Sequence, residues 1–364
     1  MTTSRHISAL DGLRGVAILM VIFWHFIVCK IQAPGGTPAG YFYKISHHAY
    51  SGVDLFFVLS GFLITGILLE SVKNPGWLRK FWIRRIFRIF PLYFLYLGIV
   101  ISFHMAQERG GDAIMAAPAS WWPYFLMLQN IQMAEANSLG PWGITWSLAI
   151  EEQFYIIFPL LICFVSARRY LPILCMIAIG LSMALRLQEG VHSLSSFVLT
   201  PYRLDGLAVG AFCAWFVKKP SLWNKFQERP WIANSMVVLG FLSLAWITIR
   251  NQQRAPIDHL VFAFAYGALL LLVVARERSI PALLLSHPIL CFFGAISYPL
   301  YLFHELCDWA ISHYLPNTSH SVIEILMIAL LSTGCSVAVA ALLNYQIGQP
   351  MVRIGRRLAE EKAL

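Results

Sequence analysis

The stretch LDGLRGVAILMVIFWHFIVCKI, from Leu10 to Ile31, is apolar over a length that can cross a bilayer, yet it contains Asp11, Arg14 and His25. Ionisable side chains at membrane depth are costly unless they are paired or hydrated, so the first hypothesis for them is a function. Arg14 and His25 are separated by about three helical turns, which places them on one face of a helix and roughly 16 Å apart. The stretch therefore predicts a helix that lines a polar site along its length.

The composition of the whole chain is that of a polytopic membrane protein, with 58% hydrophobic and only 12% charged residues among 364. This balance lies far from that of soluble globular domains. We expect an all-α fold of about ten transmembrane helices around a central polar cavity, with both termini cytoplasmic. We further expect a single membrane-embedded domain, residues 1–364, without a soluble C-terminal domain. The seven cysteines show no metal-like spacing, so we predict no metal site.

Ten apolar stretches are long enough to be candidate spans. They are residues 10–30, 51–70, 86–105, 143–165, 171–187, 203–217, 231–249, 257–275, 285–308 and 321–345. With ten spans and both termini inside, most of the basic residues fall on the inner side, as the positive-inside rule requires. The net charge of +9 therefore reflects membrane topology, and we expect no nucleic-acid partner. The short apolar segment 119–131 is interpreted as interfacial or re-entrant, because an eleventh span would invert the topology after it.

This topology assigns a depth to each polar residue within the spans. The outer half receives a set of groups suited to acid–base chemistry or to acceptor binding: His25, Asp54, Ser60, Trp146, Glu151, Tyr155, Arg203, Asp205, Tyr301 and His304. The inner end receives Arg14 and the basic segment that contains Arg85 and Arg88. Guanidinium groups at i and i+3 suit the binding of a polyphosphate. We therefore hypothesise a phosphate-bearing donor that enters from the cytoplasm and extends a reactive end to His25, the natural base at neutral pH.

Five segments resemble the motifs of the acyltransferase-3 family of membrane O-acyltransferases. They are ALDGLRGVAILMVIFWHF (9–26), GVDLFFVLSGFLIT (52–65), RRIFR (84–88), WSLAIEEQFYIIFP (146–159) and ISYPLYLFHE (296–305). Arg14 and His25 fall on the arginine and histidine of the opening motif, Arg85 and Arg88 on the RxxR pair, and Glu151 on the acidic position of its motif. The order of the motifs on this topology makes the resemblance specific.

The resemblance implies transfer of an acyl group, usually from acetyl-CoA, to a hydroxyl of a surface polysaccharide such as O-antigen or exopolysaccharide, a lipid-linked sugar or another glycoside. In this scheme His25 and Glu151 are catalytic, and Arg14, Arg85 and Arg88 bind acyl-CoA, which is a donor substrate rather than a tightly bound cofactor. The implied location is a bacterial cytoplasmic (inner) membrane. The implied partners are a carbohydrate or glycolipid acceptor and membrane lipid. The acyl group would pass to the acceptor directly or through a separate extracytoplasmic acyl-handling protein.

Each of these residues also has a structural interpretation. His25 can serve as an interhelical hydrogen-bonding residue, Arg14 can balance Asp11 one turn away, and Arg85 and Arg88 can act only as determinants of topology. The oxyanion donors are not assigned, and the residues do not separate direct transfer from an acyl-histidine step. The alternative function is a proton-coupled transporter of a small molecule or sugar, because such proteins also carry His, Asp and Glu within their spans.

Overall fold

The computed structural model describes residues 7–31, 37–110, 118–164, 167–250, 255–315 and 322–361. These residues form helices joined by short connections, and no strand occurs among them. The all-α prediction is therefore confirmed. Both ends of the predicted domain lie outside the described residues, as do several connections: residues 1–6, 32–36, 111–117, 165–166, 251–254, 316–321 and 362–364.

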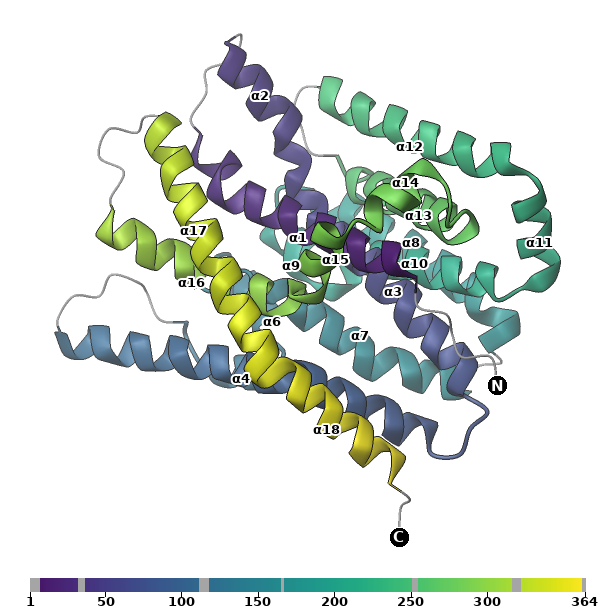
Figure 1. The fold of residues 1–364 in the computed structure, drawn as a ribbon, viewed down its shortest axis with the longest axis horizontal. Coiled ribbons are helices and arrows are strands. Elements are labelled where there is room, and N and C mark those ends of the chain that lie inside the picture. The colour runs from purple at the N-terminus through teal and green to yellow at the C-terminus, as the bar shows by residue number, and fades with distance from the viewer. Residues whose placement is uncertain are drawn as a thin grey trace.

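The helices differ widely in length (Figure 1). The long ones are α1 (Ser8–Phe26), α3 (Gly52–Ser71), α4 (Trp77–Gly110), α7 (Thr145–Phe164), α8 (Ala167–Glu189), α10 (Leu204–Val217), α12 (Pro230–Ile249), α13 (Asp258–Ala275), α16 (Ser297–Tyr314), α17 (Val322–Leu343) and α18 (Gln349–Glu360). The short ones are η1 (Val28–Lys30), α2 (Pro38–Ser46), η2 (His47–Ser51), α5 (Trp122–Phe125), α6 (Gln129–Glu135), α9 (Leu194–Val198), η3 (Thr200–Tyr202), α11 (Pro220–Glu228), α14 (Ile280–Leu285), α15 (Pro288–Ala295) and the π-helix η4 (Asn344–Gly348).

Eight helical stretches in the described part of the chain are long and apolar enough to cross a membrane. A ninth is formed by α15 and α16 together, which are bent by 74° with respect to each other. The apolar α10 has only 14 residues and is shorter than these. Together these stretches coincide with the ten predicted spans, and the protein is a multi-pass membrane protein. Residues 119–131 contain only α5 and the start of α6, so this segment holds no spanning helix.

Helix α1 lies in the middle of the bundle, as Figure 1 shows. It packs against α3, α14, α15, α16 and α17, which come from opposite ends of the chain. Helix α4 runs along the lower edge of Figure 1 beside α18. Because α1, α3, α4, α7 and α16 meet in the centre, the polar residues predicted on these helices can face one another.

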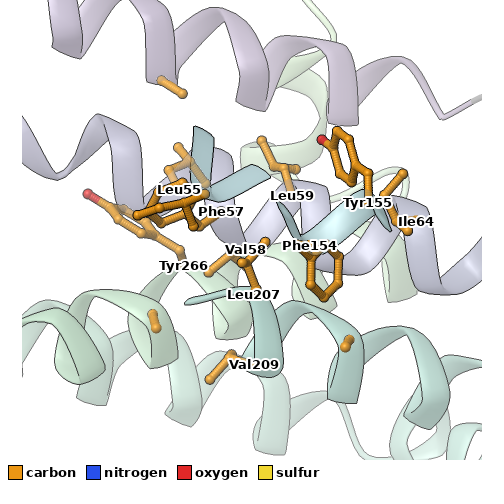
Figure 2. Close-up of a cluster of buried hydrophobic side chains, with 14 of the residues drawn as sticks. Leu55, Phe57, Val58, Leu59, Ile64, Phe154, Tyr155, Leu207, Val209 and Tyr266 are labelled. Carbon is orange, nitrogen blue, oxygen red and sulfur yellow. The ribbon is translucent and has the colours of Figure 1, made fainter. Parts of the chain in front are cut away.

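A continuous apolar core joins α3 to its neighbours α7, α10 and α13 (Figure 2). Its fully buried members include Leu55, Val58 and Leu59 on α3, and they pack near Leu207 on α10 and Phe154 on α7. On the outside of the bundle, α12 exposes the large apolar side chains Val238, Leu239, Phe241, Leu242, Trp246 and Ile249. Such a surface would be costly in water and matches a lipid environment.

The contact between α3 and α10 depends on two glycines. A Cβ added at Gly61 would lie 2.1 Å from the carbonyl oxygen of Leu207, and one added at Gly210 would lie 2.0 Å from that of Val58. The two backbones therefore touch at positions where only glycine fits. Close approach of helices through small residues is a common way of packing in membranes, because lipid provides no hydrophobic force between helices.

Gly61→Ala is therefore expected to destabilise the protein by about 1–3 kcal/mol, the usual cost of adding a carbon to a filled contact. The measurement is the midpoint of thermal unfolding of the purified protein in detergent. Gly66→Ala is the matched control, because Gly66 lies on the same helix with nothing within 4 Å of an added Cβ. Equal midpoints for the two variants would contradict the close contact.

Candidate active site

A polar cavity lies among α1, α3, α4, α7 and α16, and we name it the central cavity. It encloses about 840 Å³ of empty space, its open mouth included. Its polar lining consists of Arg14, Ser60, Arg85, Arg88, Ser147, Glu151, Tyr155, Ser297, Tyr298 and Tyr301. Seven of these residues are among those predicted from the sequence: Arg14, Ser60, Arg85, Arg88, Glu151, Tyr155 and Tyr301. All five motif segments thus contribute to one cavity.

Three arginines form one end of the central cavity, and we call it the arginine end. Arg14 makes an ion pair with Asp11 at 3.2 Å. Arg85 packs its guanidinium against the rings of Phe81 and Tyr155, at 5.6 and 5.7 Å from their centroids. Arg88 is exposed and forms no hydrogen bond or ion pair with another described residue. Three guanidinium groups thus lie close together and line one cavity with a single carboxylate, that of Glu151, in its lining, so this end is suited to an anion.

Glu151 lies on α7 and holds two neighbours within the cavity. Its Oε1 accepts a hydrogen bond from the Ser60 hydroxyl at 2.9 Å, and its Oε2 accepts one from the Tyr155 hydroxyl at 3.0 Å. The Ser60 and Tyr155 hydroxyl oxygens are 3.0 Å apart, which closes a triangle. Glu151 was predicted to be catalytic together with His25, but among the described residues the hydrogen-bond partners of the two side chains differ. Glu151 instead orders the wall of the central cavity.

The carboxylate beside His25 is that of Glu305, which was not among the site residues predicted from the sequence. His25 Nε2 lies 3.6 Å from Glu305 Oε1, and His25 Nδ1 lies 3.3 Å from His304 Nε2. His304 is completely buried. We call these three residues the histidine cluster. The signal for Glu305 was present in the sequence, because it directly follows His304 in the segment ISYPLYLFHE.

The hydrogen bonds of the histidine cluster fix which nitrogen of His25 is free. His304 Nδ1 lies 2.7 Å from the carbonyl oxygen of Tyr301, which only accepts, so this nitrogen donates and Nε2 of the neutral ring accepts. His25 Nδ1 therefore faces two acceptors, His304 Nε2 at 3.3 Å and the Val21 carbonyl oxygen at 2.9 Å. His25 must donate from Nδ1, and its Nε2 keeps a lone pair directed to the side of Glu305.

The ligand atoms of His25, His304 and Glu305 all lie within 4.8 Å of one another, so these residues could hold a metal ion. Zinc ligands at about 2.1 Å from a tetrahedral ion lie about 3.4 Å from one another. The cluster would have to contract to bind such an ion. Without a metal ion, His25 is placed as a base, His304 as the acceptor that orients it and Glu305 as its counter-charge. This is an arrangement used in proton transfer.

Tyr301 contacts both the central cavity and the histidine cluster. It lines the cavity, whereas His25 is not among the lining residues. Its hydroxyl donates to the Ile144 carbonyl oxygen at 2.9 Å and lies 2.5 Å from the Ser147 hydroxyl. Its ring centroid is 5.9 Å from that of His304, one turn further along α16. The arginine end, Glu151 and Tyr301 thus line one cavity, and the ring of Tyr301 contacts the histidine cluster at His304.

Comparison with known families supports this assembly of motifs. The model of acyltransferase-3, which is described as an acyltransferase domain, matches residues 7–345. The chain belongs to the acyltransferase-3 family.

Curated relatives point in the same direction. The O-acetyltransferase OatA of Staphylococcus aureus strain NCTC 8325 / PS 47 is 28% identical over 363 residues, which cover 91% of this chain and 56% of OatA. A protein of Staphylococcus aureus strain COL that carries a provisional O-acetyltransferase name is 30% identical over 328 residues, 82% of this chain and 50% of that protein. The chain thus spans about half the length of the curated relatives it matches. No solved structure matches it.

In this acyltransferase-3 chain, the remaining predicted residues form a third group outside the central cavity. Arg203 binds Asp54 Oδ1 at 2.8 Å, and both side chains are at most 2% exposed. The guanidinium of Arg203 lies between aromatic rings, with its carbon 5.1 Å from the centroid of Trp146. Asp205 binds Arg186 at 2.7 Å, again with both side chains 1% exposed. None of these residues lines the central cavity, and Trp146 is buried rather than open to a sugar.

Proposed function

We propose that the protein is a membrane O-acyltransferase that moves an acyl group, most simply acetyl, from acyl-CoA to a hydroxyl of a carbohydrate or glycolipid. The observation that carries this proposal is a cavity lined by three arginines and by Tyr301, whose ring contacts the histidine cluster, in a chain of the acyltransferase-3 family. In this proposal the donor follows a path from the arginine end, past Tyr301, to His25.

The arginine end supports the binding of the phosphates of CoA. Arg14, Arg85 and Arg88 line the same cavity although they come from two helices, α1 and α4. Guanidinium groups bind phosphate oxygens through paired hydrogen bonds and remain charged in apolar surroundings. Their common orientation into one cavity favours this role over a purely topological one.

The length of α1 supports the reach of the donor. Arg14 and His25 lie on one continuous helix, Ser8–Phe26, and are roughly 16 Å apart at the helical rise per residue. A phosphopantetheine arm is of the same order. With its phosphates at the arginine end, the donor would carry its thioester along the cavity towards His25, and this end would have to pass the ring of Tyr301.

His25 Nε2 is the atom that would accept the proton of the attacking hydroxyl. The hydroxyl oxygen forms a bond to the thioester carbonyl carbon, the bond from that carbon to sulfur breaks, and the proton passes through His25 to the departing thiolate. The products are an ester and the free thiol of CoA. Glu305 at 3.6 Å would stabilise the imidazolium that exists between the two proton transfers, and His304 would hold the ring in the required tautomer.

The acceptor would approach His25 from the side opposite to the donor, which for a bacterial protein corresponds to the outer face of the cytoplasmic (inner) membrane. A surface saccharide such as O-antigen or exopolysaccharide, a lipid-linked sugar or another glycoside fits this role. Delivery either to this acceptor directly or to a separate extracytoplasmic acyl-handling protein is compatible with the path.

The test is donor binding and acetyl transfer by purified protein in lipid nanodiscs, with radiolabelled acetyl-CoA and bacterial surface glycans. The double variant Arg85→Ala/Arg88→Ala is expected to weaken binding of acetyl-CoA at least tenfold, because charge-assisted hydrogen bonds contribute about 1.5–3 kcal/mol each. Arg84→Ala is the matched control. Arg84 lies on the same helix but pairs with Glu360 at 3.6 Å and does not line the central cavity.

Equal affinity of the double variant and the control for acetyl-CoA would show that the arginine end does not bind the donor. Absence of label on any glycan, combined with uptake of a small molecule driven by a pH gradient in proteoliposomes, would instead favour the proton-coupled transporter.

A further inference from the structure

A second cavity opens beside the first, and we name it the α18 cavity. It encloses about 880 Å³ of empty space, its open mouth included, among α4, α15, α16, η4 and α18. Its polar side chains are Arg88, Ser297, Tyr298, Asn344, Gln349, Arg353 and Arg356. Neither the sequence analysis nor the proposed reaction assigned a role to Asn344, Gln349, Arg353 or Arg356.

The α18 cavity is strongly cationic. Three guanidinium groups line it, those of Arg88, Arg353 and Arg356, and its lining contains no Asp or Glu. All three side chains are exposed and form no ion pair with another described residue. On the same face of the protein, Arg84 does have such a partner, Glu360 at 3.6 Å. Three unpaired cations converging on one hollow repel one another unless an anion joins them.

The two cavities are neighbours with a common wall. Arg88, Ser297 and Tyr298 line both the central cavity and the α18 cavity. Tyr298 is fixed in this wall, since its hydroxyl donates to the Ile89 carbonyl oxygen at 2.9 Å. A ligand whose phosphates lie at Arg88 could therefore extend one part into each cavity.

We propose that the α18 cavity binds the nucleotide end of acyl-CoA, a nucleoside bearing a 3′-phosphate and a 5′-diphosphate, while the pantetheine arm occupies the central cavity. This inference rests on the proposed function. Arg353 and Arg356 hold the 3′-phosphate, Arg88 holds the diphosphate at the common wall, and the carboxamides of Asn344 and Gln349 offer both donors and acceptors to the base.

The backbone around the α18 cavity is built to keep these groups in place. Helix α18 lies directly on α4, because a Cβ added at Gly355 would be 2.5 Å from the Cβ of Phe87. The segment before it, Asn344–Gly348, is a π-helix, a form that is rare and often found at functional sites. Gly348 leaves room for Asn344, whose Oδ1 would be 3.1 Å from an added Cβ.

The experiment compares two donors in nanodiscs of phosphatidylcholine alone: acetyl-CoA and acetyl-phosphopantetheine, which lacks the nucleotide. The unsubstituted protein is expected to bind acetyl-CoA at least tenfold more tightly. Arg356→Ala and Arg353→Ala should each weaken acetyl-CoA binding about tenfold and leave the binding of acetyl-phosphopantetheine unchanged. Arg357→Ala is the matched control, because Arg357 is the next residue on α18 and does not line the cavity.

A second arm tests the other source of phosphate, the headgroups of anionic lipid. The same measurements are repeated with phosphatidylglycerol in the nanodiscs. Loss of acetyl-CoA affinity in Arg356→Ala that occurs only with phosphatidylglycerol would overturn the proposal in favour of a lipid site. Unfolding midpoints equal to that of the unsubstituted protein show that the variants are folded.

The outcomes separate this inference from the proposed function. Equal affinity of the unsubstituted protein for the two donors would overturn the nucleotide site and leave the acyltransferase proposal standing. Binding of neither donor would overturn both. Equal losses in Arg356→Ala and Arg357→Ala would show a general effect of surface charge and would also overturn the site.

Discussion

His25→Ala should abolish acetyl transfer, with a fall in turnover of about 10²–10⁴-fold, the usual contribution of a general base. Only His25 offers a free ring nitrogen in the histidine cluster, since the Nε2 of His304 is already engaged by His25 Nδ1 at 3.3 Å. The measurement is the initial rate of label transfer from radiolabelled acetyl-CoA to the glycan.

Donor binding should be almost unchanged in the same variant, because His25 does not line the central cavity that we propose as the donor site. This split between turnover and binding distinguishes a lost base from a damaged fold. His192→Ala is the control, since His192 is exposed and lies outside both cavities. Transfer by His25→Ala at the rate of this control would show that another residue is the base.

Asp54→Ala should produce the largest loss of stability, about 3–5 kcal/mol, the usual cost of leaving one partner of a buried ion pair alone. Asp54 Oδ1 is the acceptor for Arg203 at 2.8 Å and also lies 3.1 Å from His259 Nδ1. Its removal leaves a guanidinium that is 1% exposed without its counter-charge. The measurement is the midpoint of thermal unfolding in detergent.

Lys218→Ala is the comparison for this prediction. Lys218 pairs with Glu70, but both side chains are more than two-fifths exposed, so the loss should be about 0–1 kcal/mol. The result also tests the sequence-based view that Asp54 and Arg203 bind the acceptor. An unchanged unfolding midpoint with a raised KM for the glycan would support that view and contradict a structural role.

The sequence predicted the spans well because their length and hydropathy are local properties. Arg14, Arg85 and Arg88, which the sequence places at the inner end of the spans, line one cavity, and their role in donor binding stays a prediction. The segments 52–65 and 146–159 meet there as well, because Ser60 and Tyr155 both donate hydrogen bonds to Glu151. In these cases helical periodicity and depth sufficed, because each residue faces the middle of the bundle.

The partner of His25 could not be predicted in this way. Depth alone placed Glu151 and His25 in the same half of the membrane, but depth does not say which helices touch. The contact of α16 with α1 depends on the bend of 74° between α15 and α16, which no local pattern signals. The pairing of Asp54 with Arg203 spans 149 positions and was equally hidden, so two charges that neutralise each other were interpreted as available to a ligand.

The position of Tyr301 bears on the permeability of the membrane itself. A cavity that admits a charged donor at one end and an acceptor at the other would be a pore if its two halves were ever continuous, and protons would leak through it. If the donor occupies the central cavity, the Tyr301 ring, held by Ile144 and Ser147, would form its wall on the side of His304. The cell could thus expose this protein to cytoplasmic metabolites without discharging its proton-motive force.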